Sequence, residues 1–275
     1  MKEIANEIRI ALDEHRASVG LTFTEEGHRY TLPGLDKIVS VSGIVHKYHE
    51  PFDRDEVALR VAKGDETRMM ELIAEWEEKG RVARLTGNYV HYHLEQFLVE
   101  KFELDKEVRE PILDGLDDTI ITKGDKMIIA GKLQIDKMIE RGAYLIDTEV
   151  VMGSVEAGYV GQCDCAWVGK DPEGNVKLCM TDWKTNKPSK FSDSYFDKPM
   201  YYPFNMMNDN AVGKYSLQLS LYERLMLDML KNSHPDLSFS NSIIVSLRQK
   251  PVGTYKEFRV GEVLRQLAYN LELDV

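Results

Sequence analysis

Two short stretches of the chain decide the fold, "GYVGQCDCAW" (residues 158–167) and "LCMTDWKTNK" (residues 178–187). Both are rich in apolar, strand-forming residues, and each carries one aspartate in its interior, Asp164 and Asp182. A carboxylate that is buried without a partner costs several kcal/mol. If the two stretches are strands, a cation or a hydrogen-bond donor must therefore lie beside each of these side chains.

The surrounding sequence predicts an antiparallel β-meander. Turn-forming residues separate three β-rich runs, which are "YLIDTEVVMG" (144–153), "GYVGQCDCAWVG" (158–169) and "VKLCMTDWKTN" (176–186). The segment "DPEGN" (171–175) predicts a hairpin loop between the second and third runs. Asp164 and Asp182 then lie on neighbouring strands, where opposite Cβ atoms are roughly 4.5–5.5 Å apart. Two carboxylates at that distance repel each other unless a cation lies between them.

A divalent metal ion is the natural compensation for such a pair. Hard carboxylate oxygens favour Mg²⁺ or Mn²⁺. Lys184 follows Asp182 by two residues, so both side chains point to the same face of the strand. A metal, two acids and an amine suit hydrolysis of a phosphodiester, because the metal activates water while the ammonium orients the nucleophile or stabilises the pentacovalent transition state.

The remaining patterns predict helices and strands on both sides of the meander. Before the meander, we expect a helix over residues 1–16, a hairpin over 21–32, and a strand followed by a helix capped by Ser42 over 37–49. Two or three helices are expected between Asp55 and Lys101. After the meander, we expect a helix over 215–230, strands over 241–249 and 255–260, and a final helix from Gly261. No internal repeat is present.

Length and charge set broad limits. A chain of 275 residues with 43% hydrophobic content forms one large domain or two small ones. We expect one continuous unit, with an N-terminal α+β and helical region (1–80) packed on a core (81–275). The net charge of −11 excludes a wholly basic nucleic-acid coat but not a local basic groove. No long apolar run is present, so we expect a cytoplasmic protein without a membrane partner.

The acidic motifs resemble those of a known enzyme family. "GQCDCAW" and "TDWKTN" resemble the G-x-x-D and D-x-K-T motifs of the PD-(D/E)XK nucleases, in the RecB-like or lambda-exonuclease-like branch. That branch also carries a helical G-x-x-x-H-x-x-x-E motif, a strand glutamate before the first aspartate and a Q-x-x-x-Y helix. The matching residues are Gly87, His91, Glu95, Glu149, Gln218 and Tyr222. The motifs occur in the family's order over roughly half of the chain.

The resemblance implies a fold and a set of roles. The fold would be α+β with a restriction-endonuclease-like core, in which helices flank a central mixed β-sheet with an antiparallel meander, plus a helical N-terminal region. One or two Mg²⁺ or Mn²⁺ ions would bind His91, Asp164, Asp182 and the Trp183 backbone carbonyl. The catalytic residues would be Lys184, Asp164, Asp182 and Glu149. The substrate would be held by Thr185, Gln218 and Tyr222. The site would be supported by Gly87, Glu95 and Gly161.

The cysteines bear on a further property of the family. Some relatives hold an iron–sulfur cluster with four cysteines, whereas this chain has three, Cys163, Cys165 and Cys179, all between the motifs and without C-x-x-C spacing. We expect no iron–sulfur cluster, and free thiols instead.

The segment between the third strand and the following helix (187–210) mixes lysines with aromatic residues. Lys187, Lys190, Tyr201 and Tyr202 suit a single DNA strand, because lysines contact phosphates and aromatic rings stack on bases. A packed arm that covers the sheet is the alternative.

The sequence thus favours a metal-dependent DNA nuclease, most simply an exonuclease acting on linear or single-stranded DNA ends in recombination, repair or phage replication, with a recombination or replication protein as partner. A structure-specific endonuclease and a non-catalytic DNA-binding or protein-interaction module remain alternatives. Taken alone, each of four site residues also has a purely structural interpretation. His91 is typical of a core histidine, and Glu149 is typical of a solvent-facing strand residue. Gln218 and Tyr222 are typical of residues that pack a helix. Polarity and oligomeric state stay open.

Overall fold

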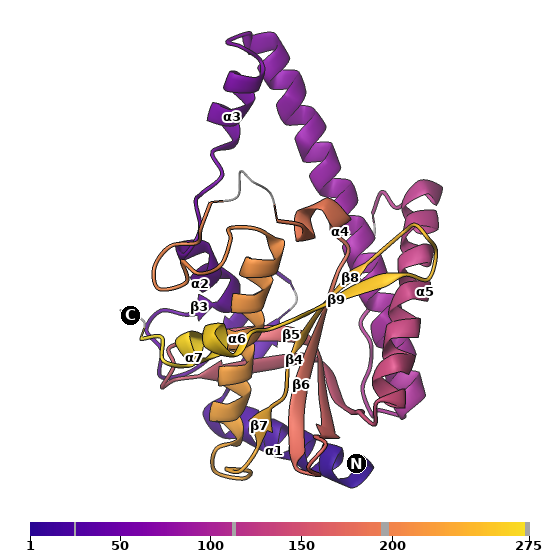
Figure 1. Ribbon diagram of the computed structural model, residues 1–275, viewed down its shortest axis with the longest axis vertical. Coiled ribbons are helices and arrows are strands. Elements are labelled where there is room, and N and C mark those ends of the chain that lie inside the picture. Colours follow the sequence, from indigo (N-terminus) through magenta and orange to yellow (C-terminus); the bar gives the residue numbers. More distant parts are fainter. Residues whose placement is uncertain (25, 112–113, 194–197, 273–275) are drawn as a thin grey trace.

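The computed structural model describes residues 1–275 except 25, 112–113, 194–197 and 273–275. It confirms the predicted α+β class, because a seven-stranded mixed sheet carries helices on both faces (Figure 1). The strands are β1 (Thr22–Thr24), β2 (Arg29–Thr31), β3 (Val39–Ser40), β4 (Tyr144–Ser154), β5 (Tyr159–Lys170), β6 (Val176–Lys184), β7 (Ser238–Phe239), β8 (Ile243–Leu247) and β9 (Tyr255–Arg259). The helices are α1 (Lys2–Val19), α2 (Val41–Lys47), α3 (Arg54–Val61), α4 (Glu66–Phe102), α5 (Asp118–Glu140), the 3₁₀ helix η1 (Pro188–Phe191), α6 (Ala211–Leu230) and α7 (Glu262–Tyr269).

The predicted meander forms the centre of the sheet. β4, β5 and β6 pair antiparallel in sequence order. β8 pairs with β6 in parallel and β9 pairs with β8 antiparallel, while the short strands β3 and β7 pair in parallel with β5 and β6. β1 and β2 form a separate hairpin, as expected. The return from β6 to β8 passes through α6, which lies across one face of the sheet (Figure 1).

Apolar side chains fill both sides of the sheet. Val168 and Met180 enter the core shared with α1, α2, α6 and α7, while Trp167 and Trp183 enter the core shared with α4 and α5. A strand that is buried on both faces has a nearly continuous run of apolar residues, which explains the apolar sequences of β5 and β6. The three cysteines are buried and free.

The long helix α4 joins the sheet to a projecting hairpin. It spans 37 residues and begins at Asp65, whose side chain accepts a hydrogen bond from the Arg68 N–H. Its C-terminal half packs against α5 and β4, whereas its N-terminal half and α3 project from the body (Figure 1). We call this projection the arm (residues 54–80). The division of the chain at residue 80 stays a prediction, and α4 crosses that residue without interruption.

The predicted cap of α2 is wrong by two residues. The cap is Ser40, whose Oγ accepts a hydrogen bond from the Gly43 N–H at 3.1 Å, and Ser42 lies inside the helix. Ser40 has the extended backbone that a cap requires, and Val41 directly after it is fully buried.

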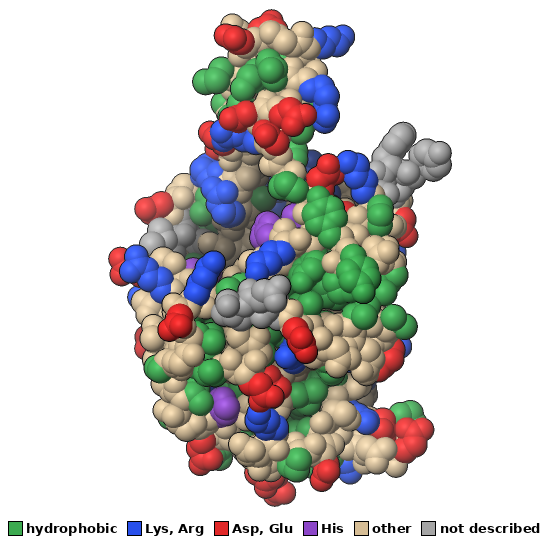
Figure 2. All heavy atoms as spheres, turned by 90° about the vertical axis from the view of Figure 1, so that its left-hand side faces the viewer, with side chains coloured by type: hydrophobic (Ala, Val, Ile, Leu, Met, Phe, Trp, Pro, Cys, Tyr) green, Lys and Arg blue, Asp and Glu red, His purple; other side chains and the backbone are tan. Residues whose placement is uncertain are grey.

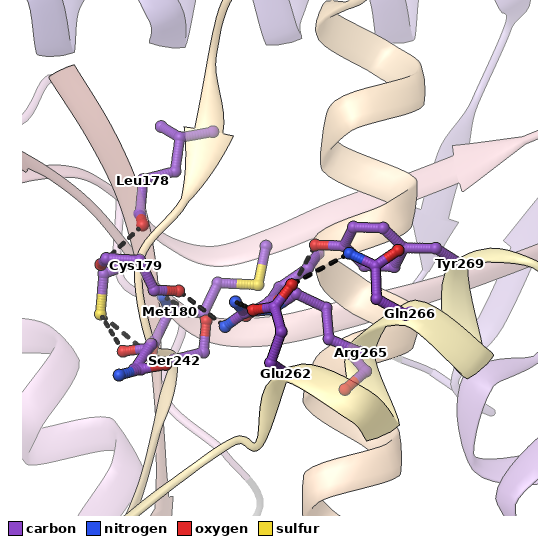
Figure 3. A network of polar contacts seen from close by, with 12 residues as sticks. Leu178, Cys179, Met180, Ser242, Glu262, Arg265, Gln266 and Tyr269 are labelled. Atoms are coloured by element: carbon purple, nitrogen blue, oxygen red, sulfur yellow. Dashed lines mark hydrogen bonds and ion pairs between the residues drawn. The ribbon is translucent and has the colours of Figure 1, made fainter. Parts of the chain in front are cut away.

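A buried ion pair fixes the C-terminal helix (Figure 3). Arg265 of α7 donates from Nε to the fully buried Glu223 of α6 at 2.6 Å and from Nη2 to the Ser240 carbonyl at 2.7 Å. The Tyr269 hydroxyl donates to the same Glu223 carboxylate at 2.8 Å. Each charge in this network therefore has a partner, as burial demands. No helix in the described ranges combines the length and the apolar character needed to cross a membrane.

Candidate active site

Three acidic side chains lie at one level across β4, β5 and β6. The pairs Thr148–Cys165 and Val150–Cys163 place Glu149 opposite Asp164. The pair Cys165–Thr181 places Asp182 opposite Asp164 on the other side. The antiparallel register therefore brings together acids that are far apart in the sequence, as expected for the two aspartates.

The β5–β6 ladder opens at this level. Its last backbone pair is Cys165–Thr181, and the next N–H, that of Trp183, donates instead to Asp164 Oδ2 at 2.6 Å. A side-chain oxygen thus takes the place of a backbone acceptor. This hydrogen bond is one of the compensations that the buried Asp164 requires.

His91 of α4 supplies the second compensation for Asp164. Its Nδ1 lies 3.5 Å from Asp164 Oδ1, and its Nε2 lies 3.0 Å from the Trp183 carbonyl oxygen. Burial alone would lower the pKa of His91, but the Asp164 carboxylate outweighs it and raises this pKa to about 9. An imidazolium with both nitrogens protonated can donate to both oxygens. Although burial opposes it, this cation also holds the pKa of Asp164 below its usual value.

Glu149 reaches the site through an unusual backbone conformation. Its φ of 45° lies in the left-handed region, which costs a non-glycine residue roughly 1–3 kcal/mol and is concentrated at functional sites. Burial and then the charge of Asp164 raise the pKa of Glu149 to about 8. The crowding of negative charge is therefore centred on Glu149.

His91, Glu149 and Asp164 together form a candidate metal group. Within the described ranges these three offer ligand atoms that all lie within 4.8 Å of one another. One imidazole and two carboxylates suit Mn²⁺ or Mg²⁺. We call these residues the His–Glu–Asp group.

Asp182 and Lys184 form an ion pair beside this group. Lys184 Nζ lies 2.7 Å from Asp182 Oδ2, which confirms that the two side chains share one strand face. Burial raises the pKa of Asp182 to about 6, although Lys184 opposes the shift. Burial would lower the pKa of Lys184, but Asp182 and Asp164 raise it, so the ammonium stays charged at neutral pH. Asp182 lies outside the His–Glu–Asp group.

Lys106 is a second, half-buried cation that the sequence did not indicate. Its Nζ lies 3.2 Å from Glu95 Oε1 and donates to the Thr148 carbonyl at 2.5 Å. The Thr148 hydroxyl donates to the same Glu95 oxygen at 3.0 Å. Glu95 thus contacts the residue next to Glu149, in keeping with the supporting role expected for it. No spacing rule signals Lys106, because it lies in the loop after α4.

Three cavities among the described residues flank the site. One, of about 530 Å³, is lined by His91 and Glu149 of the His–Glu–Asp group and also by Arg84, Arg109 and Lys106. A second, of about 560 Å³, is likewise lined by Glu149 and Lys106. The third and larger cavity, of about 640 Å³, is lined by Gln218 and Lys190 from the predicted substrate set and by Tyr215, whose ring lies 4.4 Å from Lys184 Nζ. Figure 2 shows a hollow beneath the arm where basic and histidine side chains gather.

The predicted glycines lie at close approaches. A Cβ on Gly161 would stand 2.5 Å from the Tyr222 ring, so only glycine admits that ring against β5. A Cβ on Gly87 would stand 3.6 Å from Thr185 Oγ1, which places α4 directly beside the end of β6. Gln218 Nε2 donates to the Tyr222 hydroxyl at 2.8 Å, so the Q-x-x-x-Y pair is in contact.

The lysine and aromatic segment lies partly beside the site. Lys190 lines the larger cavity and Lys187 is exposed. Tyr201 and Tyr202 are exposed, and the Tyr201 N–H donates to the Tyr48 carbonyl beside α2. Residues 194–197 of this segment lie outside the described ranges.

Comparison with known proteins finds distant structural likeness only. No protein-family model and no curated protein matches the chain. A solved structure of a Eubacterium rectale protein, provisionally described as an exonuclease, is similar with a TM-score of 0.38 and 16% sequence identity. The match covers 74% of this chain and 68% of that one. Because so low a TM-score carries no argument, the proposals below rest on the residues themselves.

Proposed function

We propose that the protein is a metal-dependent nuclease that hydrolyses phosphodiester bonds of DNA and acts from DNA ends as an exonuclease. The observation that carries this proposal is the gathering of three acids at one level of three adjacent strands, beside the charged Lys184 of β6 and His91 of α4. The resemblance of the same residues to the PD-(D/E)XK motifs supports it.

The His–Glu–Asp group fits a divalent cation. Its ligand atoms are already gathered, and the raised pKa of Glu149 reflects excess negative charge that a cation would relieve. Asp182 and the Trp183 carbonyl lie next to the group and complete the proposed ligand set. When bound, the ion would supply Lewis acidity and lower the pKa of water to produce a nucleophile at neutral pH.

The protein's own residues orient and balance charge around that ion. The Trp183 N–H fixes the Asp164 carboxylate, and His91 would give up one proton to become a neutral ligand. Lys184, held 2.7 Å from Asp182, keeps a positive charge where the transferred phosphate becomes more negative. Tyr215 packs against this ammonium and restricts its position.

End dependence tests the exonuclease part of the proposal. We expect linear duplex DNA to be degraded with Mn²⁺ or Mg²⁺ and closed circular DNA of the same sequence to be spared. The measurement is a time course with end-labelled linear, single-stranded and circular substrates, with EDTA as the control. Rapid nicking of the circle would establish an endonuclease, and intact DNA under all metal conditions would overturn the nuclease proposal.

Metal affinity should depend on pH in a defined direction. Protons compete with the metal for His91 and Glu149, whose pKa values are about 9 and about 8. Mn²⁺ binding should therefore weaken as pH falls from 8.5 to 6.5, by up to about tenfold per pH unit for each proton released. Isothermal titration calorimetry in two buffers of different ionisation enthalpy measures this release.

A matched pair of histidine variants isolates the His91 contribution. His91→Asn should lower metal affinity and flatten its pH dependence, whereas His93→Asn on the same helix should leave both unchanged. Equal effects of the two variants would contradict ligation by His91.

A further inference from the structure

A cavity at the base of the arm carries two aromatic rings. Phe52 and Trp76 face each other with ring centroids 6.0 Å apart and planes tilted by 54°. Together with Arg54, Glu77, Gly80 and Arg84 they line a cavity of about 380 Å³, which we call the aromatic pocket. Phe52 is 69% exposed. Two adjacent aromatic rings that line one cavity form a contiguous apolar surface, which is a feature of ligand-binding sites.

The aromatic pocket adjoins the cavity of about 530 Å³ that His91 and Glu149 line. Arg84 lines both cavities. The residues of α4 between them follow one another at spacings of three or four and therefore share one helix face; they are Trp76, Gly80, Arg84, Gly87 and His91. A ligand that extends from the metal group along α4 thus meets the aromatic rings.

The charges around the aromatic pocket favour a phosphate near Arg84. Arg54 is occupied by ion pairs to Asp55 at 2.8 Å and Glu77 at 2.7 Å. For Arg84, by contrast, no carboxylate of the described residues lies within ion-pair distance. Gly80 presents no side chain to the pocket, and a Cβ there would meet Arg84 Nη1 at 3.5 Å. Rings on one side and an unpaired guanidinium on the other match a nucleobase and its phosphate.

We propose that the aromatic pocket binds a base of single-stranded DNA whose phosphates pass Arg84 on the way to the His–Glu–Asp group. The inference rests on the proposed nuclease function and extends it to a substrate class. A base inside a duplex is stacked on both faces and cannot stack on the open face of Phe52 or Trp76, so the pocket selects an unpaired strand.

Tryptophan fluorescence gives a direct test in EDTA, where cleavage does not interfere. Trp167 and Trp183 are at most 1% exposed, so a base that stacks in the aromatic pocket reaches only Trp76 among the three tryptophans. Titration of the full chain with oligo(dT) should quench the emission, and a blunt hairpin duplex of equal length should not. Trp76→Leu should abolish the quench.

Affinity measurements identify the contribution of each ring. By fluorescence anisotropy with labelled oligo(dT), Phe52→Ala and Trp76→Leu should each weaken binding about tenfold, which is the effect of losing one base–aromatic stack. Met70→Ala is the matched control, because Met70 is 65% exposed on the same arm and does not line the pocket. With metal, Phe52→Ala should raise KM for single-stranded DNA and leave kcat unchanged.

The two proposals fail in different ways. If the protein cleaves DNA but the two ring variants bind oligo(dT) as tightly as Met70→Ala, the aromatic pocket is not a base site and the nuclease proposal stands. If the ring variants lose affinity but no metal supports cleavage, the base site stands and the nuclease proposal falls. Equal loss of affinity for the hairpin duplex would overturn selection for an unpaired strand.

Discussion

Replacement of Lys184 by alanine should reduce the rate of DNA cleavage by a factor of about a hundred to a thousand, which is typical for loss of one preorganised charge at a transition state. The ammonium is largely shielded from solvent, charged and 2.7 Å from Asp182, so its loss removes a positioned positive charge from the site. Because Lys184 does not belong to the His–Glu–Asp group, Mn²⁺ binding should persist. The measurement is kcat on end-labelled linear DNA at saturating Mn²⁺, with calorimetry for metal binding.

Lys170→Ala provides the control for that experiment. Lys170 is the last residue of β5, is exposed and belongs to none of the proposed site residues, so its loss should change kcat little. Circular dichroism of both variants checks the fold, because Asp182 loses its cation in Lys184→Ala. Cleavage by a folded Lys184→Ala variant at the wild-type rate would remove Lys184 from the mechanism.

Substitution of Asp164 by asparagine should abolish the stabilisation that metal confers. An ion that binds only the folded state stabilises it by about 2.7 kcal/mol at a hundredfold excess over Kd. For a chain of this size that corresponds to a rise in Tm of roughly 5–10 °C. Asp164→Asn should lose this rise together with cleavage, although the amide oxygen can still accept the Trp183 N–H. Thermal melts with EDTA and with Mn²⁺ measure both states.

The metal-free melts of two carboxylate variants should shift in opposite directions. The pKa of Asp164 is held below its usual value, so its charge stabilises the fold, and Asp164→Asn should melt below wild type in EDTA at pH 7.5. The pKa of Glu149 is raised to about 8, so its ionisation destabilises the fold as pH rises from the unfolded pKa near 4.5 toward 8. Glu149→Gln should accordingly melt at or above wild type in EDTA. A full metal-induced rise in Asp164→Asn would show that Asp164 is not a ligand.

The sheet and its acidic residues were accessible from sequence because strand geometry is strictly periodic. Once the three β-rich runs are recognised, the register places Asp164 beside Asp182, and the two-residue period places Lys184 on the face of Asp182. The conformation of Glu149 is not accessible in this way. Nothing in "DTEVV" distinguishes a residue with φ of 45° from an ordinary strand residue.

Helix α5 escaped prediction for a reason that the structure explains. Gly124 and Gly131 lie in its interior and weaken the helical signal by about 1 kcal/mol each. In the fold they allow close packing, since a Cβ on Gly124 would stand 2.4 Å from the Tyr89 ring and one on Gly131 would stand 2.6 Å from Leu94. Close packing against α4 thus explains the two glycines in α5, although glycine is unfavourable in a helix on local propensity alone. Lys106, Tyr215 and Arg84 were missed likewise, because packing rather than spacing brings them to the site.

The unbroken length of α4 fixes the distance between the aromatic pocket and the His–Glu–Asp group. Fifteen residues separate Trp76 from His91, and at a rise of 1.5 Å per residue this corresponds to about 22 Å along the axis. The separation is set by the continuous backbone hydrogen bonds of one helix. A strand that fills the aromatic pocket and reaches the metal group at the same time must span this interval. A fragment too short to span this distance would contact only the aromatic pocket or only the metal group. The length of the helix would therefore set the size of the smallest products.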